Sequence, residues 1–297
     1  MPTSSHAHEP KTPPILAYAG PLLTRYDVIF CDVWGVVHNG VTAFQGACRA
    51  LAKFRSGGGT VILVSNAPVP KQRVADMLDS RHVPTSAWDD IVSSGDIALG
   101  HVEEHGFRQL YCIGPQDRDQ ALFSALRARS VPLSEAEAII CTGLNDDRHE
   151  TPDDYHALLE QALAKRLLFV CANPDLIVDV GGTLLYCAGA IADLYAHMGG
   201  DVYWAGKPYL NAYETAHHKA EALRNSNVER NKILVIGDAL RTDIKGAENY
   251  GCDALFIASG IHRHETVDGI DLSATKLSDL FGPRAPPALG AMLELVW

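Results

Sequence analysis

The sequence predicts an α/β fold in which parallel sheets are covered by helices on both faces. Short runs of β-branched and aliphatic residues recur along most of the chain, and longer helical segments separate them. The runs are apolar at nearly every position. Strands that are apolar on both faces belong to sheets that are buried on both faces, and their alternation with helices is typical of parallel sheets.

The expected elements follow one another in a regular order from residue 28 onward. Strands are expected at residues 28–31, 60–65, 90–94, 109–113, 138–142, 167–172, 201–204, 232–236 and 253–257. Helices are expected at residues 44–55, 71–80, 117–129, 151–164, 210–224 and 242–250. Residues 281–297 contain three prolines before an apolar end, and we expect this tail to pack back on the body. Residues 1–14 are polar and rich in His and Pro, which is typical of a disordered arm.

Length, charge and cysteine usage exclude several classes of protein. At about 150 residues per domain, 297 residues predict two domains. The net charge of 25 − 36 = −11 argues against general nucleic-acid binding, which needs a basic surface. The seven cysteines are scattered and form no C-x-x-C pair, as expected in a reducing compartment. Neither a long apolar run nor the apolar core of a signal peptide is present, so we expect a cytoplasmic protein with no membrane partner.

Polar residues follow four of the expected strands, where ligands bind in open parallel sheets. Asp32 directly follows the run at 28–31 and precedes a turn that contains Gly35. It is either a turn or capping residue, or else a nucleophile or a metal ligand. Ser65 and Asn66 end the run at 60–65. They either cap the next helix or donate hydrogen bonds to a phosphate group.

The other two motifs lie later in the chain. Lys207 stands between Gly206 and Pro208 after an expected strand. It is either a solvated lysine, as is usual at such a position, or one that the tight turn holds so that its charge meets an anion. Asp238 and Asp243 are five residues apart and follow the run at 232–236. Carboxylates in this arrangement suit Mg²⁺, although Asp243 alone also fits an acidic residue at a helix N-terminus.

Together and in this order, the four motifs resemble those of the haloacid dehalogenase (HAD) superfamily of aspartate-nucleophile hydrolases. The long insert between the second and third motifs resembles subfamily IIA, the NagD-like and p-nitrophenyl-phosphatase-like branch. Gly35-Val36, the segment at 237–243, and Asn173-Pro174-Asp175 after an expected strand match features of that branch. The resemblance covers roughly residues 25 to 265.

The resemblance implies a role for each motif. Asp32 is the expected nucleophile, which forms an aspartyl-phosphate. The carboxylates of Asp32 and Asp238 and the main-chain carbonyl of Trp34 are the expected Mg²⁺ ligands, and Asp243 is expected to orient water at the metal. The phosphate oxygens are expected to meet Ser65, the backbone of Asn66, and Lys207, whose charge offsets the repulsion between a carboxylate and a phosphate.

Trp34 departs from the pattern of this superfamily. Its phosphatases carry a second Asp two residues after the nucleophile, which protonates the leaving group and then activates water. Trp cannot do this, and the loss of such a group typically costs about 10²- to 10⁴-fold in rate. His38 is a candidate replacement, and an exposed loop histidine is the alternative. The superfamily's haloalkanoate dehalogenases carry Tyr at this position and use no metal, but they usually have Asn where Asp238 stands here.

The resemblance also implies the architecture. We expect a Rossmann-like, doubly wound core at residues 15–106 and 201–297, with a smaller α/β cap domain at 107–200 and the arm at 1–14. The polar residues Asn145, Asn173 and Asp175 fall at the ends of expected cap strands. They either face the substrate or cap the helices that follow.

The expected function is that of a Mg²⁺-dependent phosphatase which acts on a small phosphorylated metabolite. Trp34 leaves two alternatives open: a phosphate-binding regulatory protein with little turnover, or a metal-independent, dehalogenase-like hydrolase. The expected partner is the small substrate rather than nucleic acid, and a homodimer is left open.

Overall fold

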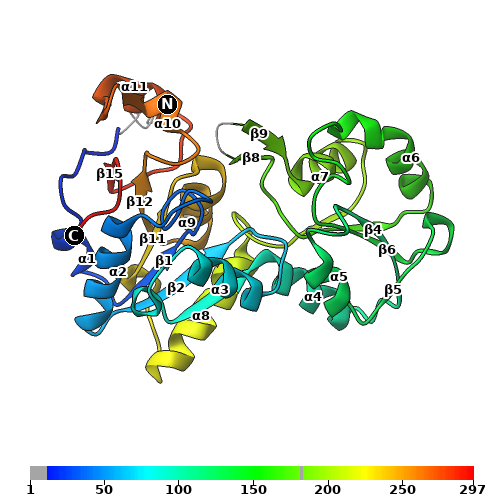
Figure 1. Ribbon diagram of the computed structural model, residues 1–297, viewed down its shortest axis with the longest axis horizontal. Helices are drawn as coiled ribbons and strands as arrows, with labels where there is room; N and C mark the ends of the chain where they lie inside the picture. Colours follow the sequence, from blue (N-terminus) through cyan, green and yellow to red (C-terminus); the bar gives the residue numbers. More distant parts are fainter. Residues whose placement is uncertain (1–11, 181–182) are drawn as a thin grey trace, which may run out of the picture.

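Two parallel sheets lie side by side in the computed structural model of the chain (Figure 1). The structure describes residues 12–180 and 183–297. The larger sheet has the order β15-β12-β11-β1-β2-β3, and all its neighbouring strands are parallel. Its strands are β1 (Val28–Cys31), β2 (Thr60–Ser65), β3 (Asp90–Ser93), β11 (Ile233–Gly237), β12 (Asp253–Ile257) and β15 (Gly290–Met292). The predicted α/β class with parallel sheets is confirmed.

Side chains of the central strand alternate between two apolar layers, which makes this sheet doubly wound. Ile29 and Cys31 face the layer of α2 (Gln45–Ser56) and α3 (Lys71–Ser80). Val28 and Phe30 face the layer of α8 (Leu210–Arg224), α9 (Lys245–Tyr250) and α11 (Ala274–Leu280). Both faces of β1 are therefore buried, as its unbroken apolar sequence predicts.

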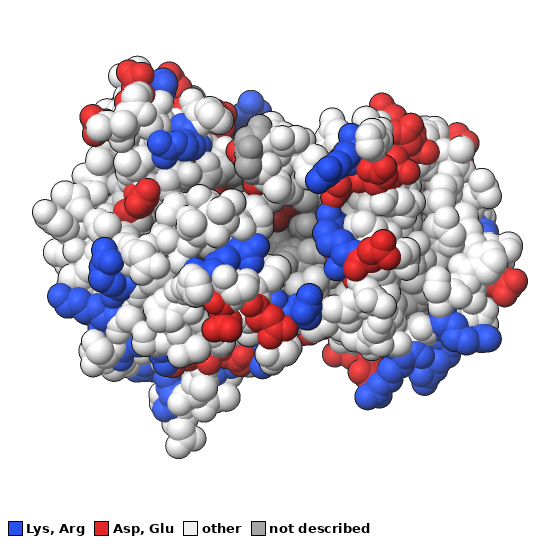
Figure 2. Space-filling model, in the orientation of Figure 1, with Lys and Arg blue, Asp and Glu red and all other residues white. Residues whose placement is uncertain are grey.

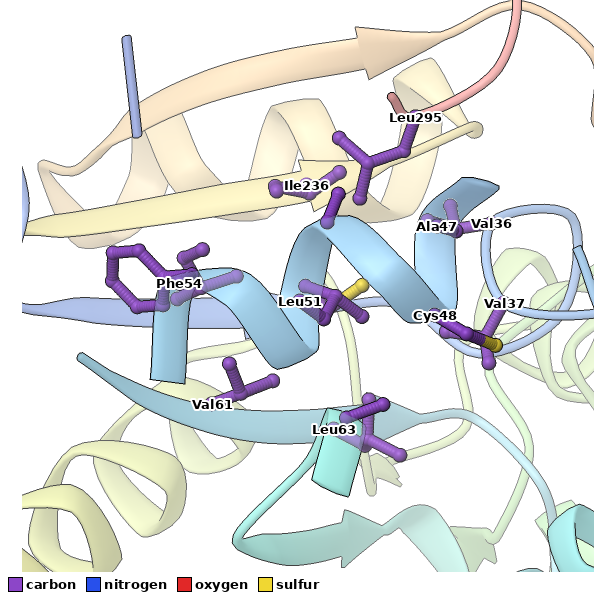
Figure 3. Packing of buried hydrophobic residues seen from close by; sticks show 14 of the residues in the cluster. Val36, Val37, Ala47, Cys48, Leu51, Phe54, Val61, Leu63, Ile236 and Leu295 are labelled. Atoms are coloured by element: carbon purple, nitrogen blue, oxygen red, sulfur yellow. The ribbon is translucent and has the colours of Figure 1, made fainter. Parts of the chain in front are cut away.

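The first of these layers is centred on α2. Leu51 and Phe54 of that helix pack above Val61 and Leu63 of β2 (Figure 3). Burying side chains of this size stabilises a fold by about 1.5–3 kcal/mol each. This packing fixes the position of β2, and thereby of the polar residues that follow it.

The smaller sheet has the order β10-β7-β6-β4-β5 and is also parallel. Its strands are β4 (Gln109–Ile113), β5 (Arg129–Ser130), β6 (Ala138–Cys141), β7 (Leu168–Cys171) and β10 (Val202–Trp204). The helices α4 (Ser94–Glu104) and α5 (Gln120–Ala125) share one apolar layer with it. The other face carries α6 (His156–Ala164) and α7 (Ala188–His197).

The expected domain limits at residues 106 and 201 remain a prediction. The pairing of β10 with β7 favours a later second limit, because the smaller sheet includes residues up to Trp204. In the same way α4 packs on the smaller sheet, although its residues precede 106. Lys207 follows β10 by only three residues, so the chain returns from this sheet directly into the site described below.

Several elements were not predicted. The strand β15 adds the C-terminal tail to the edge of the larger sheet, in agreement with the expected packing of that tail. Two further helices, α4 and α7, are as long as the predicted ones. The other unpredicted elements are short: α1 (Gly20–Leu23), β5, α10 (Arg263–Thr266), α11, and the hairpins β8 (Ile177–Val180) with β9 (Thr183–Tyr186) and β13 (Val267–Asp268) with β14 (Asp271–Leu272).

The expected disordered arm lies mostly outside the described residues, which begin at residue 12. Thr12 donates a hydrogen bond to Ser278, and the Pro14 carbonyl accepts one from Ala291. Within residues 12–180 and 183–297, no helix is both long enough and apolar enough to cross a membrane.

Candidate functional site

Three of the predicted site residues, all of them carboxylates, meet at the carboxyl end of the larger sheet. Asp32 follows β1, Asp238 follows β11, and Asp243 lies in the turn after Asp238. Oxygen atoms of these three carboxylates lie within 4.8 Å of one another, and all three residues are buried. The chain turns to opposite sides of the sheet after β1 and β11, so the cluster occupies the switch point where such sheets bind ligands.

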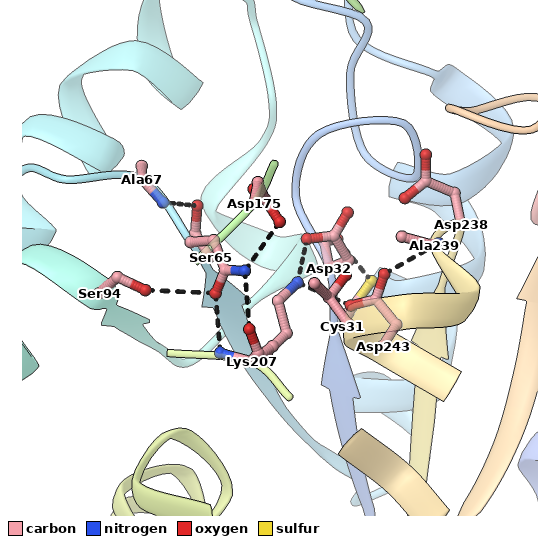
Figure 4. A network of polar contacts seen from close by, with 12 residues as sticks. Cys31, Asp32, Ser65, Ala67, Ser94, Asp175, Lys207, Asp238, Ala239 and Asp243 are labelled. Atoms are coloured by element: carbon pink, nitrogen blue, oxygen red, sulfur yellow. Dashed lines mark hydrogen bonds and ion pairs between the residues drawn. The ribbon is translucent and has the colours of Figure 1, made fainter. Parts of the chain in front are cut away.

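Lys207 brings the positive charge to this cluster. Its Nζ donates to Asp32 Oδ1 at 2.5 Å and to Asp243 Oδ1 at 2.7 Å (Figure 4). Burial opposes the charge on this lysine, but Asp243 and Asp32 outweigh that effect and raise its pKa well above the usual value. Lys207 is therefore a fixed cation between two carboxylates.

The carboxylates carry more negative charge than one lysine can balance. Burial raises the pKa of Asp32 to about 7, although Lys207 acts in the opposite direction. Burial, with Asp32 and Asp243 adding to it, raises the pKa of Asp238 well above its ordinary range. Asp238 accepts one hydrogen bond, from the Ile261 backbone at 2.6 Å. Three carboxylates and one lysine leave a charge of −2 when all are ionised.

This donor set fits a divalent cation. Hard cations such as Mg²⁺ bind oxygen ligands, usually one or two carboxylates together with further oxygens. Among the described residues, no hydrogen bond to the Trp34 carbonyl oxygen is recorded, so that predicted ligand is available as well. Two glycines make room for Asp238: a Cβ on Gly260 would lie 1.8 Å from its Oδ2, and one on Gly35 would lie 2.3 Å from it. Mg²⁺ itself remains a prediction.

Asn66 ties the loop after β2 to the segment around Lys207. Its Oδ1 accepts from the Lys207 backbone at 2.8 Å and from Ser94 at 3.2 Å. Its Nδ2 donates to the Lys207 carbonyl at 3.1 Å and to Asp175 Oδ1 at 2.9 Å. The side chain of Asn66 is thus used for structure, whereas no partner of its backbone N–H is recorded among the described residues.

Sequence reasoning missed Ser94, Asn211 and the loop at 260–261. Asn211 holds the turn before Lys207, because it accepts from the Gly206 backbone and donates to the Trp204 carbonyl. Gly206 has a φ of +122°, and a Cβ there would lie 2.0 Å from the Ser94 hydroxyl. The Gly-Lys-Pro sequence signals the turn, but nothing in the sequence indicates which side chains hold it.

The predicted site residues of the smaller sheet have separate surroundings. Asn145 accepts a hydrogen bond from the Gly114 backbone, and Asn173 accepts one from the Asp175 backbone. Asp175 reaches the larger sheet through Asn66. Of these three, Asp175 is the one that the structure joins to the cluster around Lys207.

His38 is not an exposed loop residue, so that alternative is wrong. It has no exposed surface, and its Nδ1 accepts from the Gly40 backbone at 2.9 Å. Burial, together with the charge of Arg81, lowers its pKa to about 4. The ring of Trp34 meets it edge to face at 5.3 Å. A buried neutral histidine is poorly suited to supply a proton at neutral pH, which weakens the case for His38 as the replacement acid.

A hollow separates the two lobes on the face shown in Figure 2. Acidic atoms lie at its floor, and basic side chains, with acidic ones beside them, lie along both rims. The basic side chains at the rims attract a small anion. The acidic floor would repel that anion unless a cation balances the charge of the carboxylates.

Comparisons with known proteins identify relatives of this chain. A model for haloacid dehalogenase-like hydrolases matches residues 29–125, and a second HAD-hydrolase-like model matches residues 204–280. A crystal structure of a haloacid dehalogenase-like hydrolase from Brucella suis 1330 shares 40% identity, with a TM-score of 0.83. The match covers 95% of this chain and 100% of that one.

Two curated relatives are more distant but match over most of their length. The 5'-nucleotidase YutF of Bacillus subtilis is 24% identical over 82% of this chain and 91% of its own length. A 4-nitrophenylphosphatase of Schizosaccharomyces pombe is 24% identical over 82% of this chain and 88% of its own length. Both comparisons include the insert between the second and third motifs.

Proposed function

Because this chain belongs to the haloacid dehalogenase-like hydrolases, subfamily IIA, we propose that it is a Mg²⁺-dependent phosphatase of a small phosphorylated metabolite. The observation that carries the proposal is the buried cluster of three carboxylates and Lys207 at the switch point of the sheet. The phosphatase and nucleotidase names of its relatives support a phosphate ester as the substrate class.

In the proposed reaction, Asp32 attacks phosphorus and becomes an aspartyl-phosphate. The raised pKa of Asp32 reflects burial beside other carboxylates. Lys207, bonded to Asp32, offsets the repulsion between this carboxylate and the incoming phosphate. Ser65 and the backbone N–H of Asn66 lie at the end of the neighbouring strand β2, where they can donate to phosphate oxygens.

Asp32, Asp238 and the Trp34 carbonyl would hold the Mg²⁺ ion. When bound, the ion supplies positive charge that stabilises the phosphoryl group in the transition state. Asp243 is held by Lys207 and by the Ala239 backbone, so it is rigid beside the proposed ligands. Asp32 and Asp243 are paired with Lys207, whereas among the described residues Asp238 accepts a hydrogen bond from the Ile261 backbone alone. A bound cation would therefore stabilise the charge of Asp238 the most.

A second candidate function follows from Trp34. A protein that keeps the phosphate pocket but lacks a proton donor would bind phosphate esters with little turnover. The dehalogenase-like alternative is less favoured, because Asp238 and Asp243 retain charge that a metal-free site does not need. The cytoplasmic location and a homodimer remain predictions.

The test is hydrolysis of p-nitrophenyl phosphate with Mg²⁺ and with EDTA. We expect activity that needs the metal and that Asp32→Asn abolishes, since Asn has nearly the same shape but is a poor nucleophile. Exposed Asp146→Asn serves as the control for loss of a carboxylate. Activity in EDTA, or more than a few per cent of turnover in Asp32→Asn, would contradict the proposal. Release of halide from 2-haloacids in EDTA would favour the dehalogenase-like alternative.

A further inference from the structure

A phosphatase of this kind needs a proton donor on the side of the leaving group. In a phosphoryl transfer the attacking and leaving oxygens are roughly in line, so the leaving group departs away from the nucleophile. Asp32 follows β1 of the larger sheet. The smaller sheet also leads into the site, because β10 is followed directly by Lys207, which bonds to Asp32. The loops at the carboxyl ends of the smaller sheet are therefore a second source of a proton donor.

The side chains near the nucleophile do not supply this donor. The indole of Trp34 lies against Gly40, where a Cβ would be 2.5 Å from the ring. His38 is buried and neutral, and its Nδ1 is engaged by the Gly40 backbone. Asp243 is held by Lys207, and Asp238 belongs to the proposed metal site.

Asp175 is a carboxylic acid that reaches the site from the smaller sheet. It follows β7 of the smaller sheet in the segment Asn173-Pro174-Asp175. Asn66, the residue directly after Ser65, donates to Asp175 Oδ1 at 2.9 Å. In the view of Figure 4, the Asp175 carboxylate lies between the labelled side chains of Ser65 and Asp32. This contact places a side chain of the smaller sheet beside the predicted phosphate-binding loop.

The surroundings of Asp175 suit a group that exchanges protons. It is only partly exposed, and among the described residues Asn66 is the one recorded hydrogen-bond donor to its carboxylate. The charged and titratable groups that act on it are Lys207, Asp243, Arg241, Cys171 and Cys187. Burial raises its pKa above the ordinary value, although Lys207 and the Asn66 hydrogen bond act in the opposite direction. A raised pKa brings a carboxyl group closer to the range in which general acids work.

We propose that Asp175 is the general acid and base of the phosphatase reaction, an inference that rests on the function proposed above. In the first step Asp32 forms a bond to phosphorus, and the bond from phosphorus to the leaving oxygen breaks. That oxygen keeps the electron pair and takes the proton of the Asp175 carboxyl group, which gives the free alcohol. In the second step the Asp175 carboxylate takes a proton from water as the water oxygen attacks phosphorus. The bond from phosphorus to Asp32 then breaks, phosphate leaves, and both carboxyl groups return to their starting states.

The experiment compares one substrate that needs protonation with one that does not. The proteins are the wild type, Asp175→Asn, and the control Asp146→Asn, which removes an exposed carboxylate from a loop that follows β6 of the smaller sheet. Each is assayed with Mg²⁺ on glycerol phosphate and on p-nitrophenyl phosphate. Asn retains an oxygen that can accept from Asn66, and calorimetry of Mg²⁺ binding checks that the site of Asp175→Asn remains intact.

For Asp175→Asn we expect kcat/KM on glycerol phosphate to fall by about 10²- to 10³-fold, the usual range for a lost general acid. On p-nitrophenyl phosphate we expect kcat/KM to change by less than about threefold, because p-nitrophenolate leaves without a proton. Loss of the base then slows the second step, so kcat falls and a burst of one p-nitrophenolate per site appears. Asp146→Asn is expected to behave as the wild type.

Other outcomes are distinguishable. An equal fall on both substrates without a burst would mean that Asp175 only positions the loop through Asn66, and no change on either would also overturn the inference. A wild type that hydrolyses neither ester would overturn the proposed function itself, and the role of Asp175 with it.

Discussion

Trp34 has a packing role that explains how the chain tolerates it at this position. Its ring covers Gly40, which has a φ of +87° and no room for a Cβ, and it meets His38 edge to face. The Trp34 side chain therefore supports the turn that follows the nucleophile. Within residues 12–180 and 183–297, no hydrogen bond engages the carbonyl oxygen of the same residue, so its backbone can serve as a ligand.

Trp34→Asp tests whether a carboxylate at this position can replace Asp175. In the wild-type background we expect Trp34→Asp to raise kcat/KM on glycerol phosphate by less than about threefold, because Asp175 already donates the proton. In the Asp175→Asn background we expect at least about a tenfold gain. Loss of the half-buried indole should reduce the free energy of unfolding by about 2–3 kcal/mol.

Trp34→Phe is the matched control, because it removes the indole and adds no carboxylate. Trp34→Phe should lose part of the stability that Trp34→Asp loses. In the Asp175→Asn background it should not raise kcat/KM on glycerol phosphate. A large gain from Trp34→Asp in the wild-type background would show that no effective acid is present there.

His38 is predicted to make the fold sensitive to acid. Its pKa is about 4 in the folded chain and about 6.5 when unfolded, so the unfolded chain binds more protons between these values. The contribution of His38 to the free energy of unfolding is fully present above pH 6.5, and it is lost as the pH falls toward 4. From pH 7.5 to pH 5 the loss is about 2 kcal/mol for this group.

The measurement is urea unfolding of wild type and His38→Asn at both pH values. Asn Oδ1 can still accept from the Gly40 backbone, so His38→Asn should fold and should lose about 2 kcal/mol less on acidification. Exposed His264→Asn is the control. Burial also lowers the pKa of His101 to about 4. His38→Asn should therefore still lose some stability on acidification, because His101 is unchanged. An identical pH dependence in His38→Asn and wild type would contradict this account.

At the scale of elements, the strands that carry the site were the most predictable part of the chain. β1, β2 and β11 are buried at every position, so their sequences show the unbroken apolar runs of a parallel sheet. The polar residues at their ends then fall at one edge of the sheet, which is why Asp32, Ser65 and Asp238 could be placed from sequence. β15 could not, since Gly-Ala-Met is too short to show a strand pattern.

Tertiary contacts account for most of what the sequence left open. The expected helix at 242–250 is preceded by a π-helical turn, Leu240–Ile244, that presents Asp243 to Lys207. Gly237 allows this turn, because a Cβ there would lie 2.1 Å from the Asp243 carboxyl carbon. The burial of His38 depends on packing, and the contact between Asn66 and Asp175 joins residues that are distant in sequence. A local sequence pattern predicts neither of them.

Gly260→Ala is predicted to weaken metal binding without touching a ligand. The added Cβ would lie 1.8 Å from Asp238 Oδ2, so the carboxylate or the loop must move. Displacing a group that orients a ligand typically costs about 10- to 100-fold in metal affinity. Calorimetric titration with Mg²⁺ measures this change.

Gly100→Ala provides the matched control for this substitution. Gly100 lies within α4, and an added Cβ there meets nothing within 4 Å. This variant should keep its Mg²⁺ affinity and gain about 0.5–1 kcal/mol of stability from the better helix former. Equal Mg²⁺ affinity in Gly260→Ala and wild type would show that Asp238 is not a ligand in its present position.

At the scale of the whole molecule, the two sheets are joined at the site itself. The Asn66–Asp175 hydrogen bond connects them, and Arg241 approaches Asp193 of α7 at 4.0 Å. The carboxylate cluster, whose three charges are paired with the one charge of Lys207, thus lies where the two sheets are joined. In the absence of a cation this charge works against folding, because buried like charges repel in a medium of low dielectric constant.

Mg²⁺ is therefore predicted to stabilise the whole fold through this one cluster. At 100 times its dissociation constant, the ion should raise the free energy of unfolding of wild type by about 2.7 kcal/mol. Asp238→Asn should gain far less from the ion. Without Mg²⁺ it should be at least as stable as wild type, since it removes one of three neighbouring carboxylates and keeps an oxygen for the Ile261 N–H.

Urea unfolding with Mg²⁺, and with NaCl at equal ionic strength, separates binding from general screening. Asp146→Asn, at an exposed site, should follow wild type in both salts. If NaCl stabilised wild type as much as Mg²⁺ does, the effect would be screening of the net charge of −11 rather than occupation of a site. If Asp238→Asn gained as much from Mg²⁺ as wild type, the ion would bind elsewhere. Only a gain that is specific for Mg²⁺ and lost in Asp238→Asn agrees with a cation held between the ends of β1 and β11.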